Sequence, residues 1–176
     1  MPNVSFCTTE GDVYYNPSTT PPTPTETKVV AKYYVDYDGE EITLFYLGSG
    51  SGSGSGDDEE SNDEELEIEF PFTSMEVDGI EKDVAASYTF DTAGEHTVKF
   101  TLAEPTTIGG YAFYDCYRLT SITSLATTAP TINRYTFRNI NSGSTLYVPS
   151  GSSGYDTWMQ NSNYYLGLYN WTKVEQ

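Results

Sequence analysis

The 176-residue chain offers few side chains for acid–base or nucleophilic chemistry. His96 is its one histidine, so a Ser-His-Asp triad would have to use it. It lies in "GEHTVKF", at the start of an expected strand, and no nucleophile-elbow motif accompanies it. We therefore interpret His96 as a partly buried structural residue. The sequence predicts no catalytic residues and a protein that is not an enzyme.

Soft metal ligands are equally sparse. The chain has two cysteines, Cys7 and Cys116, which are far apart in the sequence and disfavour a zinc site. Cys116 occupies a position at which a second copy of the same pattern has Ile140, so we expect it to be a buried, small apolar residue. A disulfide between Cys7 and Cys116 remains open at this point.

Carboxylates are the one concentrated charge. Nine acidic residues lie between positions 57 and 69, directly after a Ser/Gly run at 48–56. Carboxylate oxygens suit calcium, but the run lacks the spacing of a calcium-binding loop, so we interpret it as a solvated loop with calcium binding as the alternative. Asp36, Asp38 and Glu40 form a second acidic set, which we interpret as turn chemistry. No cofactor and no metal site are predicted.

Tyrosines are the strongest candidates for recognition, because 16 of them occur in the chain and several fall at expected turns. They could stack on sugar rings or contact a protein partner, and the alternative is that most are half-buried sheet or cap residues. The predicted binding residues are Tyr114, Tyr117, Tyr135, Tyr164, Tyr165 and Tyr169.

The charge balance excludes some partners. A net charge of −18 argues against nucleic acid and disfavours an anionic membrane surface. No apolar run is long enough to span a bilayer and no secretory signal is recognisable, so we expect no membrane insertion. Either the chain is made in the cytoplasm, or a signal was removed and Met1 added for expression.

Three of the predicted recognition residues, Tyr114, Tyr117 and Tyr135, belong to a pattern that occurs twice between positions 107 and 148, always with the same spacing between its two copies. We call this spacing the repeat step, and the pairs that share it are Ile108 and Ile132, Tyr111 and Tyr135, Phe113 and Phe137, Cys116 and Ile140, and Ile122 and Leu146. The repeat step falls within the roughly 20–50 residues that are typical of solenoid repeats, so it predicts stacked coils. In these coils the side chains of Ile108, Ile132, Phe113 and Phe137 are expected to point inward. A short helix beginning near Ser153, with Tyr155, Trp158 and Met159 on one face, is expected to cap the stack. Residues 170–176 are expected to form a final edge strand.

Three segments are expected in all. Residues 1–27 form an attachment segment, a hairpin followed by a Pro/Thr linker, and its predicted attachment residues are Val4, Phe6, Val13, Tyr14 and Tyr15. Residues 28–104 form a small immunoglobulin-like β-sandwich with hairpins at 28–47 and 86–102 and a disordered loop at 48–65. Residues 105–176 form a short repeat domain with the helical cap. The Ser/Gly run fits either a natural loop or an engineered linker.

The segment "IGGYAFYDCYRLTSIT" resembles the BspA-type leucine-rich repeat of surface proteins from gut and oral Bacteroidetes, which runs I-G-x-x-A-F-x-x-C-x-x-L-x-x-I. The matching residues are Ile108, Gly109, Ala112, Phe113, Cys116, Leu119 and Ile122. The second copy departs from the pattern at Asn133, Thr136, Ile140 and Gly143. "STLYVPSGSSGYDTW" resembles the C-terminal cap of that family, and the β segment before the repeats resembles modules in proteins of Bacteroides and their phages. The resemblance covers about residues 73–176 and implies adhesion or recognition without catalysis.

The sequence therefore predicts a mainly β, non-enzymatic structural or adhesion protein. The short N-terminal segment favours a bacteriophage virion surface component, a capsid decoration or fibre, whose repeat head faces outward. The expected partners are the virion capsid or further copies of the chain as a homo-oligomer, and a glycan or protein of the host cell surface. The alternatives are a fragment of a Bacteroides cell-surface adhesin and a glycan-binding module.

Overall fold

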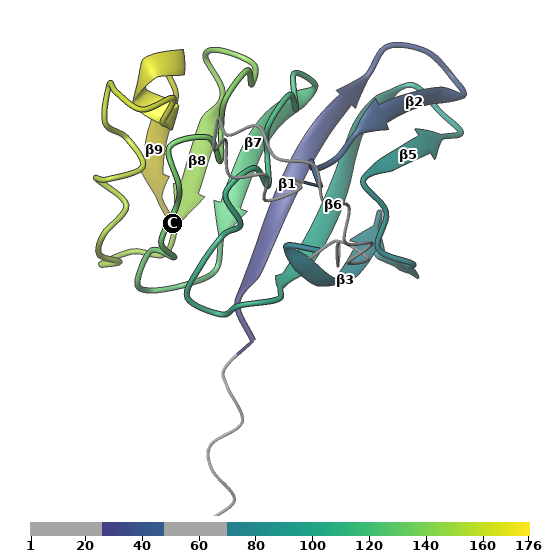
Figure 1. The fold of residues 1–176 in the computed structure, drawn as a ribbon. Helices are drawn as coiled ribbons and strands as arrows, with labels where there is room; N and C mark the ends of the chain where they lie inside the picture. Colours follow the sequence, from purple (N-terminus) through teal and green to yellow (C-terminus); the bar gives the residue numbers. More distant parts are fainter. Residues whose placement is uncertain (1–25, 48–69) are drawn as a thin grey trace, which may run out of the picture.

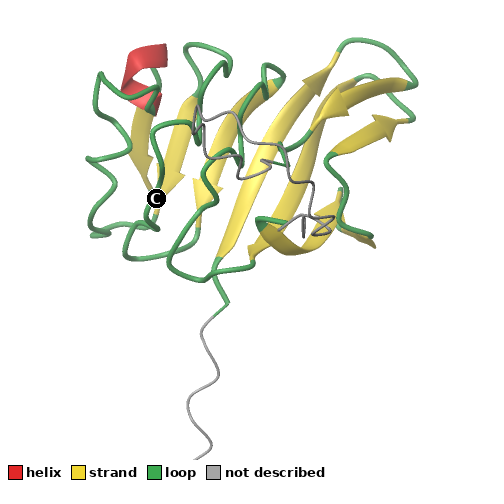
Figure 2. Cartoon of the chain, in the orientation of Figure 1, coloured by secondary structure: helices red, strands yellow, loops and turns green. Residues whose placement is uncertain are grey.

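The computed structural model describes residues 26–47 and 70–176. These residues form a seven-stranded mixed sheet in the order β4-β3-β6-β1-β7-β8-β9 and a two-stranded sheet, β2-β5 (Figure 1). The strands are β1 (Lys28–Val35), β2 (Glu40–Thr43), β3 (Phe72–Val77), β4 (Ile80–Lys82), β5 (Ser87–Phe90), β6 (Gly94–Leu102), β7 (Leu119–Ser124), β8 (Thr145–Val148) and β9 (Thr172–Glu175). Apart from the single 3₁₀ turn η1 (Leu166–Tyr169), the described segments between strands are loops (Figure 2). The predicted mainly β class is confirmed.

Strand β1 lies at the centre of the large sheet, antiparallel to both β6 and β7. Its apolar residues alternate, as a half-buried strand requires, and Val29, Ala31, Tyr33 and Val35 are fully buried on one face. The Tyr33 hydroxyl donates a 2.6 Å hydrogen bond to the Leu44 carbonyl, and burial raises the pKa of this phenol well above its ordinary value. Because β1 pairs with both β6 and β7, the large sheet continues across the expected boundary at residues 104 and 105, and the described residues show no separate immunoglobulin-like β-sandwich over 28–104.

The two predicted hairpins are wrong in their pairing. The segment after the "DYDG" turn forms β2, which pairs with β5 rather than folding back on β1. Strand β6 correspondingly pairs with β1 and β3 rather than with β5. Strands β1 and β6 each gain two partners in the seven-stranded sheet, which a local hairpin would not provide, and β2 and β5 pair with each other in the two-stranded sheet. The predicted turn at Asp78-Gly79 is confirmed, and both residues have positive φ, 50° and 82°.

The last three strands are parallel. The register pairs Ser121 with Thr145 and Ile122 with Leu146, so β7 and β8 are offset by the repeat step of the sequence pattern. Strand β9 then adds beside β8 and confirms the predicted final edge strand. Beneath them, Phe113 stacks on Phe137 at 5.9 Å with 10° between the planes. The predicted inward positions are confirmed for Ile108, Phe113 and Phe137, whereas Ile132 is half-buried.

The predicted helical cap is wrong in its backbone. Residues 153–159 form consecutive turns, because Gly154 has φ +85° and the Trp158 carbonyl accepts a hydrogen bond from the Leu166 N–H. The side chains nevertheless close the end of the core. Tyr155 and Trp158 are each 1% exposed, and the Trp158 indole N–H donates to the Pro130 carbonyl at 3.0 Å.

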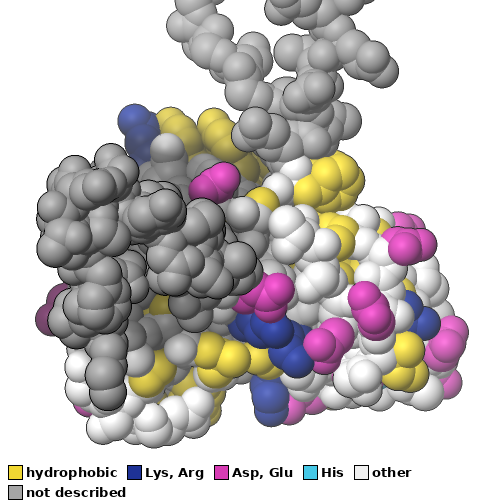
Figure 3. All heavy atoms as spheres, turned by 90° about the horizontal axis from the view of Figure 1, so that it is seen from below, with side chains coloured by type: hydrophobic (Ala, Val, Ile, Leu, Met, Phe, Trp, Pro, Cys, Tyr) yellow, Lys and Arg dark blue, Asp and Glu magenta, His cyan; other side chains and the backbone are white. Residues whose placement is uncertain are grey.

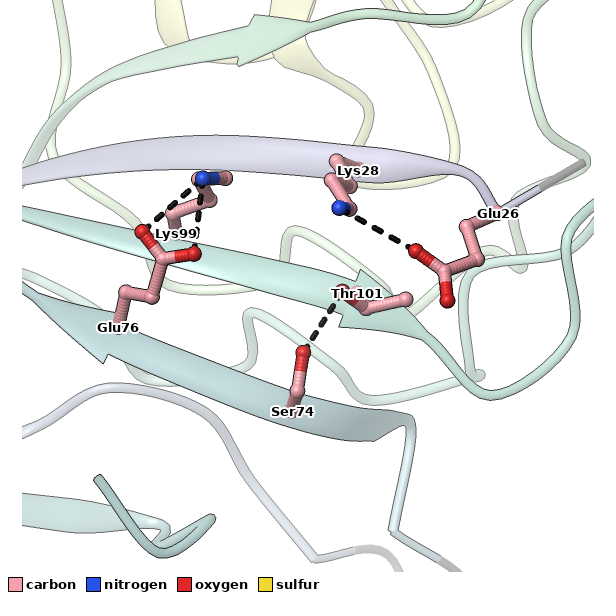
Figure 4. Close-up of polar contacts among 6 residues, drawn as sticks. All are labelled: Glu26, Lys28, Ser74, Glu76, Lys99 and Thr101. Atoms are coloured by element: carbon pink, nitrogen blue, oxygen red, sulfur yellow. Dashed lines mark hydrogen bonds and ion pairs between the residues drawn. The ribbon is translucent and has the colours of Figure 1, made fainter. Parts of the chain in front are cut away.

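The opposite face of the large sheet is polar. Lys99 bonds both carboxylate oxygens of Glu76, at 2.8 and 2.9 Å, and Ser74 bonds Thr101 at 2.7 Å (Figure 4). In the view from below, basic side chains lie directly beside acidic ones (Figure 3). Within residues 26–47 and 70–176, there is no helix of the length and apolarity needed to cross a membrane.

Candidate functional site

Five tyrosines form a row, which we call the tyrosine strip: Tyr46, Tyr111, Tyr114, Tyr135 and Tyr164. Four of them lie on the loops that precede the parallel strands, and Tyr46 lies in the segment after β2. Tyr111 stacks on Tyr135 at 5.4 Å with 10° between the rings, and Tyr135 stacks on Tyr164 at 6.0 Å and 23°. At the other end, Tyr46 lies 5.1 Å from Tyr114 and 6.1 Å from Tyr111. The strip therefore crosses the loops before β7, β8 and β9.

Each parallel strand and the loop before it form one unit, which we call a coil, and the successive coils position these rings. Tyr111 and Tyr135 are one repeat step apart, and each is followed, next but one along its loop, by a buried phenylalanine, Phe113 or Phe137. The two phenylalanines stack, and Trp158 continues their buried row. Backbone bonds join successive loops, since the Phe113 N–H donates to the Thr136 carbonyl at 2.9 Å. The outer row is thus fixed to a buried inner row of the same period.

A matched pair of left-handed residues repeats at the end of each loop. Asp115 and Asn139 have φ 57° and 60°, and the Asn139 amide donates to the Asp115 carboxylate at 2.8 Å. The backbone N–H of Asn139 donates to the Tyr169 hydroxyl at 2.9 Å. These bonds connect the first two loops to the last one beside the strip.

Two arginines lie over the strip. The guanidinium carbon of Arg134 lies 4.3 Å from the centre of the Tyr135 ring. That of Arg138 lies 5.0 Å from Tyr164 and 5.7 Å from both Tyr114 and Tyr135. These distances are within the range of cation–π attraction, which is about 0.5–1 kcal/mol at exposed sites. The strip is therefore both aromatic and basic.

A hollow of about 500 Å³ adjoins one end of the strip. Tyr46 and Tyr111 line it together with Pro71, Glu104 and Gly110. Because two strip tyrosines form part of its wall, the strip and the hollow make one continuous surface of described residues.

The structure brings together three of the six predicted binding residues, Tyr114, Tyr135 and Tyr164. Tyr169 lies beside them through its bond to Asn139. Tyr117, 63% exposed, lies near Arg118 and makes no ring contact with the strip, and Tyr165 precedes η1, also without such a contact. The predicted attachment residues Val4, Phe6, Val13, Tyr14 and Tyr15 lie outside the described residues, as does the acidic run.

Sequence reasoning missed Tyr46, Tyr111, Arg134 and Arg138. The repeat step contained the signal for two of them, since Tyr111 corresponds to Tyr135 and Arg138 to Tyr114. No sequence signal pointed to Tyr46, which reaches the strip because its N–H donates to the Ala112 carbonyl at 3.2 Å.

His96 has both ring nitrogens occupied. Nδ1 lies 2.7 Å from the Asp78 carboxylate and Nε2 lies 2.8 Å from the Thr92 carbonyl. Burial lowers the pKa of His96, but the hydrogen bonds to Asp78 and Thr92 and the Asp78 charge outweigh it, so the net pKa is raised. Two acceptors suit the doubly protonated ring, and neither nitrogen faces a hydroxyl or a thiol in these contacts. The interpretation as a structural histidine is consistent with this geometry.

The other titratable candidates are also structural. Cys116 is fully buried, its thiol donates to the Leu44 carbonyl at 3.3 Å, and burial raises its pKa, so it is a poor nucleophile. Glu40 and Asp36 both bind Arg118, and Asp38 accepts the Ala93 N–H at 2.8 Å. The described residues contain no cluster of three potential metal ligands.

The tyrosine strip, with its two arginines and adjoining hollow, is thus the candidate site. Its surface can bind by ring contact, hydrogen bonds and charge. Comparison of the chain with protein-family models, curated proteins and solved structures found no match.

Proposed function

We propose that the chain is a non-enzymatic recognition protein that binds a saccharide along the tyrosine strip. The observation that carries the proposal is the row of stacked rings Tyr111, Tyr135 and Tyr164, with Tyr46 and Tyr114 packed beside one end. Tyrosine combines an apolar ring with a hydroxyl that donates and accepts, which suits ligands that alternate C–H patches and hydroxyl groups. A saccharide chain is such a ligand.

The rigidity of the strip supports this proposal. Its rings are packed against one another and above a buried aromatic row, so little side-chain entropy remains to be lost on binding. Arg134 and Arg138 supply further hydrogen-bond donors beside the rings. The hollow beside Tyr46 and Tyr111 could receive one end of an extended ligand.

The setting we propose is the surface of a bacteriophage virion, with the chain as a capsid decoration or fibre and as a homo-oligomer. The BspA-type resemblance supports it, and parallel strands offset by the repeat step are compatible with a short leucine-rich-repeat head. A fragment of a Bacteroides surface adhesin remains the alternative setting. In both settings the strip would face a cell-surface glycan.

The test is binding of the full chain to a glycan array, followed by titration of the bound glycans. We expect Tyr111→Ala with Tyr135→Ala to weaken binding by about tenfold or more, since each ring contributes on the order of 1 kcal/mol. The matched control is Tyr37→Ala, which removes a tyrosine that is 62% exposed in the β1–β2 turn and outside the strip. Absence of any glycan binding, or equal losses in the strip variant and the control, would refute the proposal.

A further inference from the structure

We infer that the saccharide carries an anionic group, a carboxylate or a sulfate, which Arg134 and Arg138 bind at the centre of the strip. The inference rests on the proposed function and narrows its ligand class. It is argued from the charges of the chain, the geometry of the two arginines and the chemistry of guanidinium groups.

The charge distribution singles out these two residues. The chain has eight Lys and Arg residues against 26 Asp and Glu. Five of the eight form ion pairs with carboxylates: Lys28, Lys32, Lys99, Arg118 and Lys173. Among the described residues, Arg134, Arg138 and Lys82 have no such pair. Arg134 and Arg138 lie close together in sequence on one loop, and both contact rings of the tyrosine strip.

In a chain with net charge −18, carboxylates far outnumber basic groups, so each basic side chain is expected to pair with a carboxylate. The carboxylate on the neighbouring loop, Asp115, instead accepts a hydrogen bond from the Asn139 amide. Arg138 is held among Tyr114, Tyr135 and Tyr164 at 5.0–5.7 Å from their ring centres. The tyrosines therefore take the place that carboxylates occupy at the other arginine of the chain, Arg118.

This placement leaves binding capacity. Arginine has five N–H donors, and cation–π attraction to a ring does not require a hydrogen bond from them. Guanidinium groups bind carboxylates and sulfate-like oxyanions with paired, charge-assisted hydrogen bonds. Within residues 26–47 and 70–176, no side-chain hydrogen bond from either arginine competes for those N–H groups. The strip thus combines ring contacts for the sugar with guanidinium donors that form no side-chain hydrogen bond to another described residue.

The experiment uses one polymer in two charge states, polygalacturonate and its methyl ester, with dextran and dextran sulfate as a second neutral and anionic pair. The full chain is titrated with each at low and high salt. We expect at least about tenfold tighter binding of the anionic member of one pair, from one or two charge-assisted hydrogen bonds, and weaker binding at high salt. The pair that shows the preference identifies carboxylate or sulfate.

Substitutions test whether Arg134 and Arg138 cause the preference for the anionic polymer. Arg134→Gln with Arg138→Gln should remove the preference for the anionic polymer, so that the variant binds the anionic and the neutral member of the pair with similar affinity. Lys82→Gln removes a charge of the same sign from exposed strand β4 and should change affinity less than about twofold. Two results would overturn the inference. One is equal binding of the charged and neutral polymers by the unaltered chain, and the other is retention of the preference by the double variant. Glycan binding without charge preference leaves the proposed function intact, whereas absence of all glycan binding removes both.

Discussion

His96 and Asp78 hold the turn between β3 and β4 against the start of β6. The Asp78 carboxylate accepts from His96 at 2.7 Å and from the Thr97 N–H at 2.9 Å, while its backbone adopts φ 50°. Burial raises the pKa of Asp78, but the bonds from Thr97 and His96 outweigh it, so the net pKa is lowered. Each partner therefore favours the charged form of the other.

The pH dependence of stability follows from these two directions. The raised pKa of His96 gives a contribution that is complete below its ordinary pKa of 6.5 and is lost as pH rises through the folded-state value. The lowered pKa of Asp78 gives a contribution that is present above its ordinary value of 3.8 and is lost as pH falls through the folded-state value. The pair stabilises the fold most between these two ordinary values.

We expect the free energy of unfolding to fall between pH 6 and pH 8.5, by at most about 1 kcal/mol because Asp78 is nearly half exposed. His96 is the one histidine, so this window reports mainly on it. Urea unfolding across the window is the measurement. Asp78→Asn should flatten the slope, and Asp83→Asn, at an exposed loop position, should leave it unchanged. An unchanged slope in Asp78→Asn would show that the pair does not stabilise the turn.

At the scale of elements, the loops before the parallel strands set the site, and the last loop differs from the first two. The spacing from Tyr135 to Tyr164 is longer than the repeat step from Tyr111 to Tyr135, yet the rings still stack. The longer loop folds back through η1, where the Leu166 N–H donates to the Trp158 carbonyl at 2.8 Å. Gly167 then passes so close that a Cβ there would lie 2.1 Å from the Met159 carbonyl oxygen.

Gly167→Ala should therefore destabilise the protein by about 2 kcal/mol or more, because the clash is with backbone that cannot move aside. Thermal unfolding followed by circular dichroism measures the effect. Gly110→Ala is the matched control, since its Cβ would meet the Asn133 side chain at an ordinary 3.5 Å. Equal melting temperatures for the two variants would show that the last loop shifts to accommodate the added methyl group of Gly167→Ala.

The features that could be predicted from the sequence are those set by local spacing. The repeat step predicted the register of β7 and β8, the inward phenylalanines and, through Tyr135, the centre of the strip. Pairing of strands far apart in sequence could not be read in this way. β2 pairs with β5 although β3 and β4 lie between them in the chain, and Tyr46 joins the strip from a segment before β3. Such contacts depend on which buried faces fit together, and alternation within one strand does not encode that.

At the scale of the whole molecule, β1 joins the antiparallel and parallel parts of the large sheet. Val29 and Ala31 pair with β6 on one side and with β7 on the other. Aromatic contacts also cross the expected boundary, since the ring centre of Phe113 lies 6.0 Å from that of Phe72 and 6.5 Å from that of Phe100. The core on the two sides of residue 104 is thus shared.

A fragment of residues 105–176 should consequently fail to fold cooperatively, because β7 loses its antiparallel partner and Leu119 and Ile122, both fully buried, become exposed. A fragment of residues 26–176 keeps β1 and should unfold cooperatively. Far-ultraviolet circular dichroism during heating distinguishes the two. A cooperative transition in the shorter fragment would instead support the predicted independent repeat domain.

The parallel end of the sheet has a consequence for how this protein can diversify. Each coil contributes one strand, one inner ring and one outer tyrosine, and the antiparallel part contacts the stack through β1 and the first loop. Duplication of one repeat unit between the first and last coils would lengthen the strip by one ring while β1 keeps both neighbours. Gene duplication would therefore lengthen the strip and leave the antiparallel part of the sheet unchanged.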